Sequence, residues 1–320
     1  MQNDQLIEQI NQLRRQKNAV IMAHYYQTAD IQQIADFIGD SLALAQQAKK
    51  TNADIIVLCG VHFMGETAKI ICPDKKVLVP DPNAGCSLAD SCKAEDLARF
   101  KAEHPDHTVI SYVNTTAEVK ALTDVCVTSS NARKIVDTFP KDAKLIFGPD
   151  KNLGNYINSV TGRHMLLWNG ACHVHERFSV ERLVALKKQY PHAKVLAHPE
   201  CKAAIITLAD VVGSTAALLD YAKNSDSNEF LVATESGILF EMNRACSDKT
   251  FIPVPPEVSE SFDKDGNLIP CACNECNYMR LNTMQKLYDC LLNETNEIHV
   301  SPEIAAKAIV CIDRMLELSK

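Results

Sequence analysis

Short apolar runs alternate along this chain with segments that have the spacing of amphipathic helices. The run ADIIVLCG at 53–60 is nearly continuous, which is typical of a strand buried on both faces of a parallel sheet. Stretches such as 30–37 and 41–50 instead repeat apolar residues every three to four positions and predict helices. Strands that alternate with helices predict βαβ units, with helices covering both faces of parallel sheets.

One such pattern occurs three times in the chain. An apolar strand, a short helix, a second strand and another helix recur, and four columns of polar residues fall at matching internal offsets, which indicates internal repetition. The columns are His24/Tyr112/His198, Tyr26/Asn114/Glu200, Asp36/Asp124/Asp210 and Ser41/Ser129/Thr215. We therefore expect an α/β fold of three similar αβα sandwich domains with small parallel sheets, arranged around a pseudo-threefold axis.

The repeats divide the 320 residues into domains of ordinary size. The first repeat, with its N-terminal helix, is expected to span 1–103 and the second 104–189. The third is expected over 190–300, including the segment CACNEC. A closing helix at 301–320 is expected to pack back on the first domain.

Composition restricts the class of protein. Hydrophobic residues make up 46% and charged residues 23% of the chain, as in soluble globular proteins. Apolar runs fall short of the ~20 residues of a membrane span, and 1–17 predicts a polar amphipathic helix rather than a signal peptide, so we expect a cytoplasmic protein. A net charge of -7 without a basic cluster argues against nucleic-acid binding.

Thirteen cysteines without a secretory signal favour metal binding over a disulfide framework. Each repeat ends in a loop with a cysteine: Cys86, Cys172 and, in the third repeat, one of Cys271, Cys273 and Cys276. We prefer Cys276 as the third. Three thiolates that meet at one centre suit a metal or iron–sulfur site with an open coordination position.

Other interpretations of the cysteines remain open. They can be small buried residues, as we expect for Cys59, Cys126 and Cys311. The spacing from Cys273 to Cys276 is also common in zinc and redox sites. His173 and His175 flank Cys172, and we expect them to fix the loop or support a ligand rather than bind metal.

The four polar columns suggest different roles. The serine and threonine column precedes helical runs, where a hydroxyl is usually a cap, but three in register suggest anion sites at helix N-termini. The aspartate column precedes each second strand and is interpreted as structural. The two strand-end columns suit acid–base and oxyanion-handling chemistry. Their members are His24, Tyr26, Tyr112, Asn114, His198 and Glu200.

Several motifs together resemble quinolinate synthase, from about residue 18 to the C-terminus. The motifs are AHYYQ (23–27), GDSLALA (39–45), MGETAKI (64–70), DPNAGCSLAD (81–90), SYVNTTAEVKALTDVCVTSSNA (111–132), FGPDKNLG (147–154), NGACHVHE (169–176), AHPEC (197–201) and GST (213–215). The resemblance implies three αβα domains around a 4Fe–4S cluster with one open iron acting as a Lewis acid. It also implies condensation of iminoaspartate with dihydroxyacetone phosphate to quinolinate for NAD biosynthesis, with loss of phosphate and two waters.

The resemblance also implies residue roles. The cluster ligands correspond to Cys86, Cys172 and Cys276, whereas Cys271 departs from a strict CxxCxxC arrangement. Glu200, His24, Tyr26 and Tyr112 are the expected catalytic residues. The expected substrate-binding residues are His24, Ser41, Tyr112, Asn114, Ser129, His198, Glu200 and Thr215.

The expected partners are the two substrates and, transiently, an L-aspartate oxidase that supplies iminoaspartate. Two other classes of protein remain open. One is an iron–sulfur hydro-lyase that acts on a different dicarboxylate. The other is a zinc-binding or purely structural protein built around CACNEC.

Overall fold

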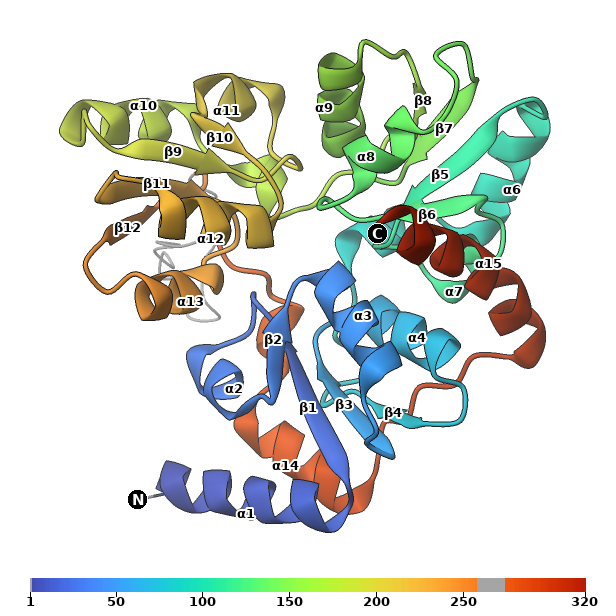
Figure 1. Ribbon diagram of the computed structural model, residues 1–320, viewed down its shortest axis with the longest axis vertical. Helices are drawn as coiled ribbons and strands as arrows, with labels where there is room; N and C mark the ends of the chain where they lie inside the picture. The colour runs from blue at the N-terminus through green and yellow to red at the C-terminus, as the bar shows by residue number, and fades with distance from the viewer. Residues whose placement is uncertain (1, 258–273) are drawn as a thin grey trace, which may run out of the picture. The chain divides into compact units, whose positions relative to one another are not determined.

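The computed structural model describes residues 2–257 and 274–320 and contains three four-stranded sheets (Figure 1). Their strand orders are β2-β1-β3-β4, β6-β5-β7-β8 and β10-β9-β11-β12, so the second strand of each set lies at one edge and the first lies beside it. Every pairing within these sheets is parallel. The predicted α/β fold with three similar sandwich units is confirmed. Cys271 and Cys273 lie outside the described residues.

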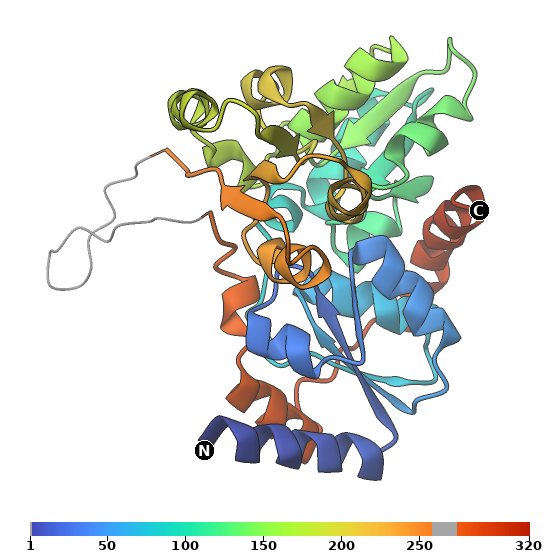
Figure 2. The same cartoon turned by 60° about the vertical axis from the view of Figure 1, so that its left-hand side comes forward.

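The first sheet has its core beneath two helices from opposite ends of the chain. Its strands are β1 (Ala19–His24), β2 (Phe37–Gly39), β3 (Ile55–Cys59) and β4 (Lys76–Leu78), with helices α1 (Gln2–Gln16), α2 (Ala29–Ile34), α3 (Ser41–Lys50), α4 (His62–Ile71), α5 (Ser87–Ser91) and α14 (Met284–Asn293). Figures 1 and 2 show α1 and α14 side by side, and the two helices are in contact. Ile10, Ile21 and Leu287 are fully buried in the core that they share. The N-terminal helix is therefore held by the C-terminal part of the chain.

The second sheet packs against the last helix of the chain. Its strands are β5 (Thr108–Tyr112), β6 (Val125–Val127), β7 (Leu145–Gly148) and β8 (Leu166–Leu167), with α6 (Ala94–Glu103), α7 (Ala117–Lys120), α8 (Ala132–Asp137) and α9 (Lys151–Thr161). The closing helix α15 (Pro302–Leu318) buries Ala308, Ile312 and Met315 completely. It contacts α7, α8 and β6 of the second repeat and also α4 of the first (Figure 1).

The third sheet belongs to a compact unit of residues 172–276, whereas 1–171 and 277–320 form another. Its strands are β9 (Lys194–Ala197), β10 (Val211–Val212), β11 (Glu229–Ala233) and β12 (Thr250–Pro253), with α10 (Val180–Gln189), α11 (Ala203–Leu208), α12 (Thr215–Asn224) and α13 (Ile238–Ala245). Phe178, Leu183, Val195 and Leu231 are fully buried in its core. Two 3-10 turns, His175–Arg177 and Met279–Leu281, complete the described secondary structure.

The aspartate column has the same structural role in every repeat. The carboxylates of Asp36, Asp124 and Asp210 accept hydrogen bonds of 2.9, 2.7 and 2.8 Å from backbone N–H groups in β1, β5 and β9. The backbone N–H of each aspartate donates back to the carbonyl of the same strand residue. Although burial raises the pKa of Asp210, the backbone N–H and Lys194 hold it below its usual value. The structural interpretation of this column is confirmed.

The two hydrogen bonds of Asp36 explain why the predicted helix at 30–37 was wrong at its C-terminal end. The helix α2 ends at Ile34, and Phe37–Gly39 is the edge strand β2. The two hydrogen bonds between Asp36 and Ile21 turn the chain out of the helix and align it beside β1. A local periodicity cannot reveal this, because the partner strand lies outside the periodic window.

Replacing Asp124 by alanine is expected to lower the free energy of unfolding by about 1–2 kcal/mol, because the N–H of Val109 loses a charged acceptor. Chemical denaturation measures the change. The matched control is Asp142→Ala, at an exposed position, for which a change within about 0.5 kcal/mol is expected. Equal stabilities of the two variants would contradict the structural role of Asp124.

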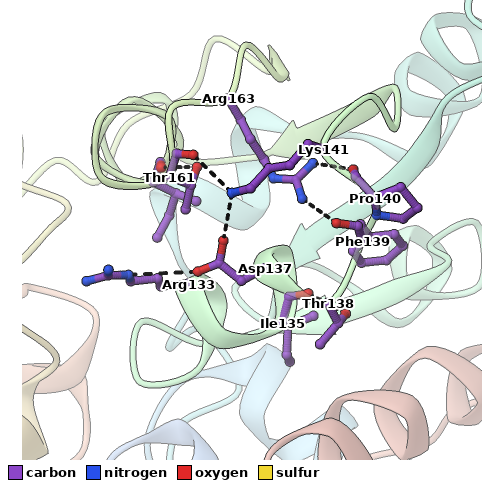
Figure 3. A network of polar contacts seen from close by, with 10 residues as sticks. Arg133, Ile135, Asp137, Thr138, Phe139, Pro140, Lys141, Thr161 and Arg163 are labelled. Atoms are coloured by element: carbon purple, nitrogen blue, oxygen red, sulfur yellow. Dashed lines mark hydrogen bonds and ion pairs between the residues drawn. The ribbon is translucent and has the colours of Figure 1, made fainter.

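A buried arginine of the second repeat takes part in a network of polar contacts (Figure 3). Arg163 is 5% exposed and donates from its guanidinium to the carbonyls of Phe139 and Pro140. Lys141 donates to the carbonyl of Thr161 and pairs with Asp137. These contacts fasten the end of α9 to the segment that connects α8 and β7.

Candidate active site

His24 and Tyr26 lie at the carboxyl end of β1, where open parallel sheets place their ligand sites. His24 is the last residue of the strand and is 6% exposed. Its Nδ1 accepts a 3.1 Å hydrogen bond from the backbone N–H of Tyr26, and the two rings meet edge-on with centroids 4.5 Å apart. An accepting Nδ1 puts the proton of the neutral imidazole on Nε2. His24 is thus prepared to donate from Nε2.

The third repeat builds the same local turn after β9. The Nδ1 of His198 accepts a 3.4 Å hydrogen bond from the backbone N–H of Glu200. In the second repeat Tyr112 ends β5, and its carbonyl accepts a 3.3 Å hydrogen bond from the Thr115 hydroxyl. Asn114 lies between those two residues. The two strand-end columns predicted from the sequence thus occupy equivalent places in their own sheets.

The hydroxyl column does not provide the helix caps in the first and third repeats. Asp40 caps α3 through the N–H of Ala43, and Ser214 caps α12 through the N–H of Ala217. Ser41 and Thr215 are the first residues inside these helices. Since the capping role is already filled, the ordinary explanation for a hydroxyl at these two positions does not apply.

In the second repeat Ser129 precedes the short helix α8, whose N-cap is Asn131. The neighbouring Ser130 donates a 2.6 Å hydrogen bond to Asp40, the residue before Ser41. The first two members of the hydroxyl column are therefore carried on two loops that are joined directly to each other.

The three candidate ligand cysteines differ from the other described cysteines in accessibility. Cys86, Cys172 and Cys276 are partly exposed, and every other described cysteine is buried. Each of the three follows the fourth strand of its set along the chain. Burial raises the pKa of Cys92 and of Cys290 to about 12, so these thiols stay protonated. Because metals bind the thiolate, the partly exposed set fits thiolate ligation better than Cys92 and Cys290 do.

Cys172 lies in a compact polar cluster within the compact unit of residues 172–276. The Nδ1 of His175 is 3.3 Å from the sulfur of Cys172 and 3.2 Å from Oε2 of Glu200. The ligating atoms of all three residues lie within 4.8 Å of one another, a spacing at which they could hold one metal ion. His175 and Glu200 are almost completely buried, at 2% and 3% exposed.

The neighbours of this cluster orient it. The Nε2 of His175 lies 3.0 Å from the hydroxyl of Thr234, which leaves Nδ1 facing Cys172 and Glu200. The ring of His198 stacks on that of His175 with centroids 4.6 Å apart, and its Nδ1 lies 3.6 Å from Oε1 of Glu200. Glu200 is thus a buried carboxylate between two imidazoles. The contact of His175 with Cys172 is compatible both with a supporting role and with metal binding by His175 itself.

Sequence reasoning missed two residues that follow β11. Thr234 contacts His175, and the fully buried Glu235 accepts hydrogen bonds from the backbone N–H groups of Gly237 and Cys276, at 2.6 and 3.1 Å. Glu235 thereby fixes the backbone that carries a candidate ligand. A threonine and a glutamate directly after the apolar run FLVA could have signalled this, because polar residues at the carboxyl end of a buried strand are often functional.

Comparison with known proteins decides the family. The family model described as "Quinolinate synthetase A protein" matches residues 8–317. The chain belongs to the quinolinate synthase family. The proteins named quinolinate synthase in Microcystis aeruginosa and Chloroherpeton thalassium are each 54% identical to it. The first match covers 99% of this chain and 96% of the relative, and the second covers 98% and 95%.

Membership of the quinolinate synthase family makes the chain an enzyme. The cluster of Cys172, His175, His198 and Glu200 at the end of a parallel strand is consistent with an enzyme. Among the described helices, none is both long and apolar enough to cross a membrane.

Proposed function

We propose that the chain condenses iminoaspartate with dihydroxyacetone phosphate to quinolinate, with loss of phosphate and two waters, as a condensing enzyme of the transferase or dehydratase type. The observation that supports this most strongly is the match to quinolinate synthases over nearly the whole chain. In this proposal the product enters NAD biosynthesis in the cytoplasm, and an L-aspartate oxidase is a transient partner that supplies the unstable imine.

The proposed cofactor is a 4Fe–4S cluster held by Cys86, Cys172 and Cys276. Their partial exposure among otherwise buried described cysteines supports this choice. Three ligands leave one iron open, and when bound such an iron supplies a Lewis acid that eases the loss of water. The backbone hydrogen bond to Glu235 orients Cys276, and the contact with His175 orients Cys172.

Glu200 is the proposed general base of the condensation. Its carboxylate lies 3.2 Å from Nδ1 of His175 and 3.6 Å from that of His198, so a proton taken from carbon can be shared with an imidazole. A base in this position removes the proton that must leave carbon before the new C–C bond forms and again during the later isomerisation.

The remaining columns are assigned to substrate binding. His24, with its proton on Nε2, and Tyr26 relay protons near the triose, and Tyr112 and Asn114 are the corresponding groups of the second repeat. His198 and Thr215 hold a carboxylate. Ser41 and Ser129 bind the phosphate or the second carboxylate, supported by the hydrogen bond that joins their loops. An acidic protein needs such local donors for anionic substrates.

The assay that tests the function uses anaerobically prepared protein with iminoaspartate and dihydroxyacetone phosphate. Quinolinate and inorganic phosphate are expected to appear together, in equal amounts. Omission of dihydroxyacetone phosphate should abolish both products. Turnover of another dicarboxylate with no need for the triose would instead indicate an iron–sulfur hydro-lyase.

A single bound metal ion is the competing arrangement, favoured by the spacing of Cys172, His175 and Glu200. Tetrahedral zinc commonly takes such mixed sulfur, nitrogen and oxygen ligands. Metal and sulfide analysis of anaerobically purified protein separates the two arrangements. About four iron and four sulfide per chain support the cluster, whereas one zinc without sulfide supports the single ion.

Replacing Cys172 by alanine is expected to remove most of the bound iron, sulfide and visible absorbance, because the cluster loses one of three protein ligands. The measurement is iron and sulfide content after anaerobic reconstitution. Cys246→Ala is the matched control: it removes a buried cysteine of the same unit and should keep the full content. Normal iron content in Cys172→Ala protein would exclude Cys172 as a ligand.

A further inference from the structure

Two buried cysteines outside the candidate site are in direct contact. The sulfur of Cys126 in β6 lies 3.1 Å from the sulfur of Cys311 in α15, although 185 positions separate them in the sequence. Both residues are 0% exposed. A disulfide needs the sulfurs at about 2.05 Å, so the two sulfurs would have to approach each other by about 1 Å.

The surroundings shift the pKa values of the two thiols in opposite directions. The thiol of Cys311 faces Cys126 and also lies 3.3 Å from the carbonyl of Lys120 and 3.2 Å from that of Ala308. The hydrogen bond with Cys311 and the nearby ammonium group of Lys120 lower the pKa of Cys126 despite its burial. The same hydrogen bond and burial raise the pKa of Cys311. Such a pair contains one nucleophilic sulfur and one proton donor.

We propose that Cys126 and Cys311 form a reversible oxidation site at which a peroxide cross-links β6 to the C-terminal helix. The Cys126 thiolate attacks one oxygen of hydrogen peroxide, the O–O bond breaks, and the departing hydroxide takes a proton to become water. Cys311 then attacks the sulfur of the resulting sulfenic acid, and its proton leaves with the hydroxyl group as a second water. Two thiols and one peroxide thus give one disulfide and two waters.

Hydrogen peroxide is little larger than a water molecule, so a small local opening of the packing around α15 would let it reach the pair. Local openings cost less free energy than global unfolding, and an opening at α15 would expose Cys311 for short periods. Once formed, the bond would fix α15 to the surface of α7, α8 and β6 that it already covers. The proposal uses none of the candidate cluster ligands and does not depend on the proposed function.

The test is mass spectrometry of the full-length chain after treatment with hydrogen peroxide. Remaining thiols are blocked with an alkylating reagent, and the protein is digested without reduction. The expected product is a pair of peptides joined through Cys126 and Cys311, lighter by two hydrogen atoms and separated by dithiothreitol. Recovery of both cysteines as alkylated thiols, under conditions that oxidise other cysteines, would overturn the proposal.

Two variants test whether the cross-link is specific to Cys126 and Cys311. Cys311→Ser should abolish the joined peptides, whereas Cys290→Ser, which removes another buried cysteine of a C-terminal helix, should keep them. The melting temperature of the peroxide-treated wild-type chain should rise by roughly 5–10 °C, because a cross-link over a long loop restricts the unfolded chain. The rise should disappear with dithiothreitol. An unchanged melting temperature in protein that carries the joined peptides would refute the claim that the bond fixes α15.

Discussion

Replacing Glu200 by glutamine is expected to reduce kcat by about 10²- to 10⁴-fold, the range that a positioned general base contributes. Glutamine keeps the size of the side chain and its contacts with His175 and His198, but it cannot accept a proton from carbon at neutral pH. The cluster ligands are unchanged, so iron content and visible absorbance should stay at the wild-type level. The measurement is quinolinate formation under anaerobic conditions, with the iron content of the same sample.

The matched control for this prediction is Glu181→Gln, which neutralises an exposed glutamate of the same unit. It should leave kcat unchanged. Wild-type turnover in Glu200→Gln protein would remove Glu200 from the proposed mechanism. A low kcat that is accompanied by loss of iron would instead indicate that Glu200 stabilises the metal site.

Replacing Lys120 by methionine is expected to lower the free energy of unfolding by about 3–5 kcal/mol, the cost of removing one partner from a buried charge network. Lys120 is completely buried, and its ammonium group donates to the carbonyls of Val113 and Thr115. It also lies 5.4 Å from the centre of the Phe63 ring. Methionine has a similar length but leaves these acceptors without their donor.

The charge of Lys120 interacts electrostatically with Glu66, which is also buried. Burial lowers the pKa of Lys120 and raises that of Glu66, and each charge opposes the shift of the other. Glu66 accepts a 3.0 Å hydrogen bond from the backbone N–H of Ala117 at the start of α7. This hydrogen bond joins α4 of the first repeat to α7 of the second.

Chemical denaturation tests the Lys120 prediction, with the exposed Lys134→Met as control, for which a change within about 0.5 kcal/mol is expected. The two carbonyls that Lys120 holds flank Asn114, so any folded Lys120→Met protein should also bind substrate more weakly. Equal stability of the Lys120→Met and Lys134→Met proteins would show that the buried ammonium group is dispensable.

The pattern of apolar and polar residues was sufficient to predict the repeated part of the fold. Alternating apolar runs and helical segments are local signals, and a polar column that recurs at fixed offsets reports a shared local structure. The aspartates that join the first two strands of each sheet are an example, since each acts within its own βα unit. The same reasoning placed His24 and His198 at equivalent strand ends. The repeat predicted a second strand after Asp36, but the helix expected at 30–37 extended into β2, because the pairing that defines this strand lies in its partner.

The sequence by itself determined three βαβ repeats, their strand-end polar columns and the family resemblance. Short sequence stretches are sufficient to recognise each of these features. Only the tertiary structure decided which side chains meet over long sequence distances. Examples are the contact of Cys126 with Cys311 and the placement of His175 between Cys172 and Glu200. Burial has the same origin: Lys120 is polar in the sequence, and only the packing of α4, α7 and α15 around it makes it part of the core.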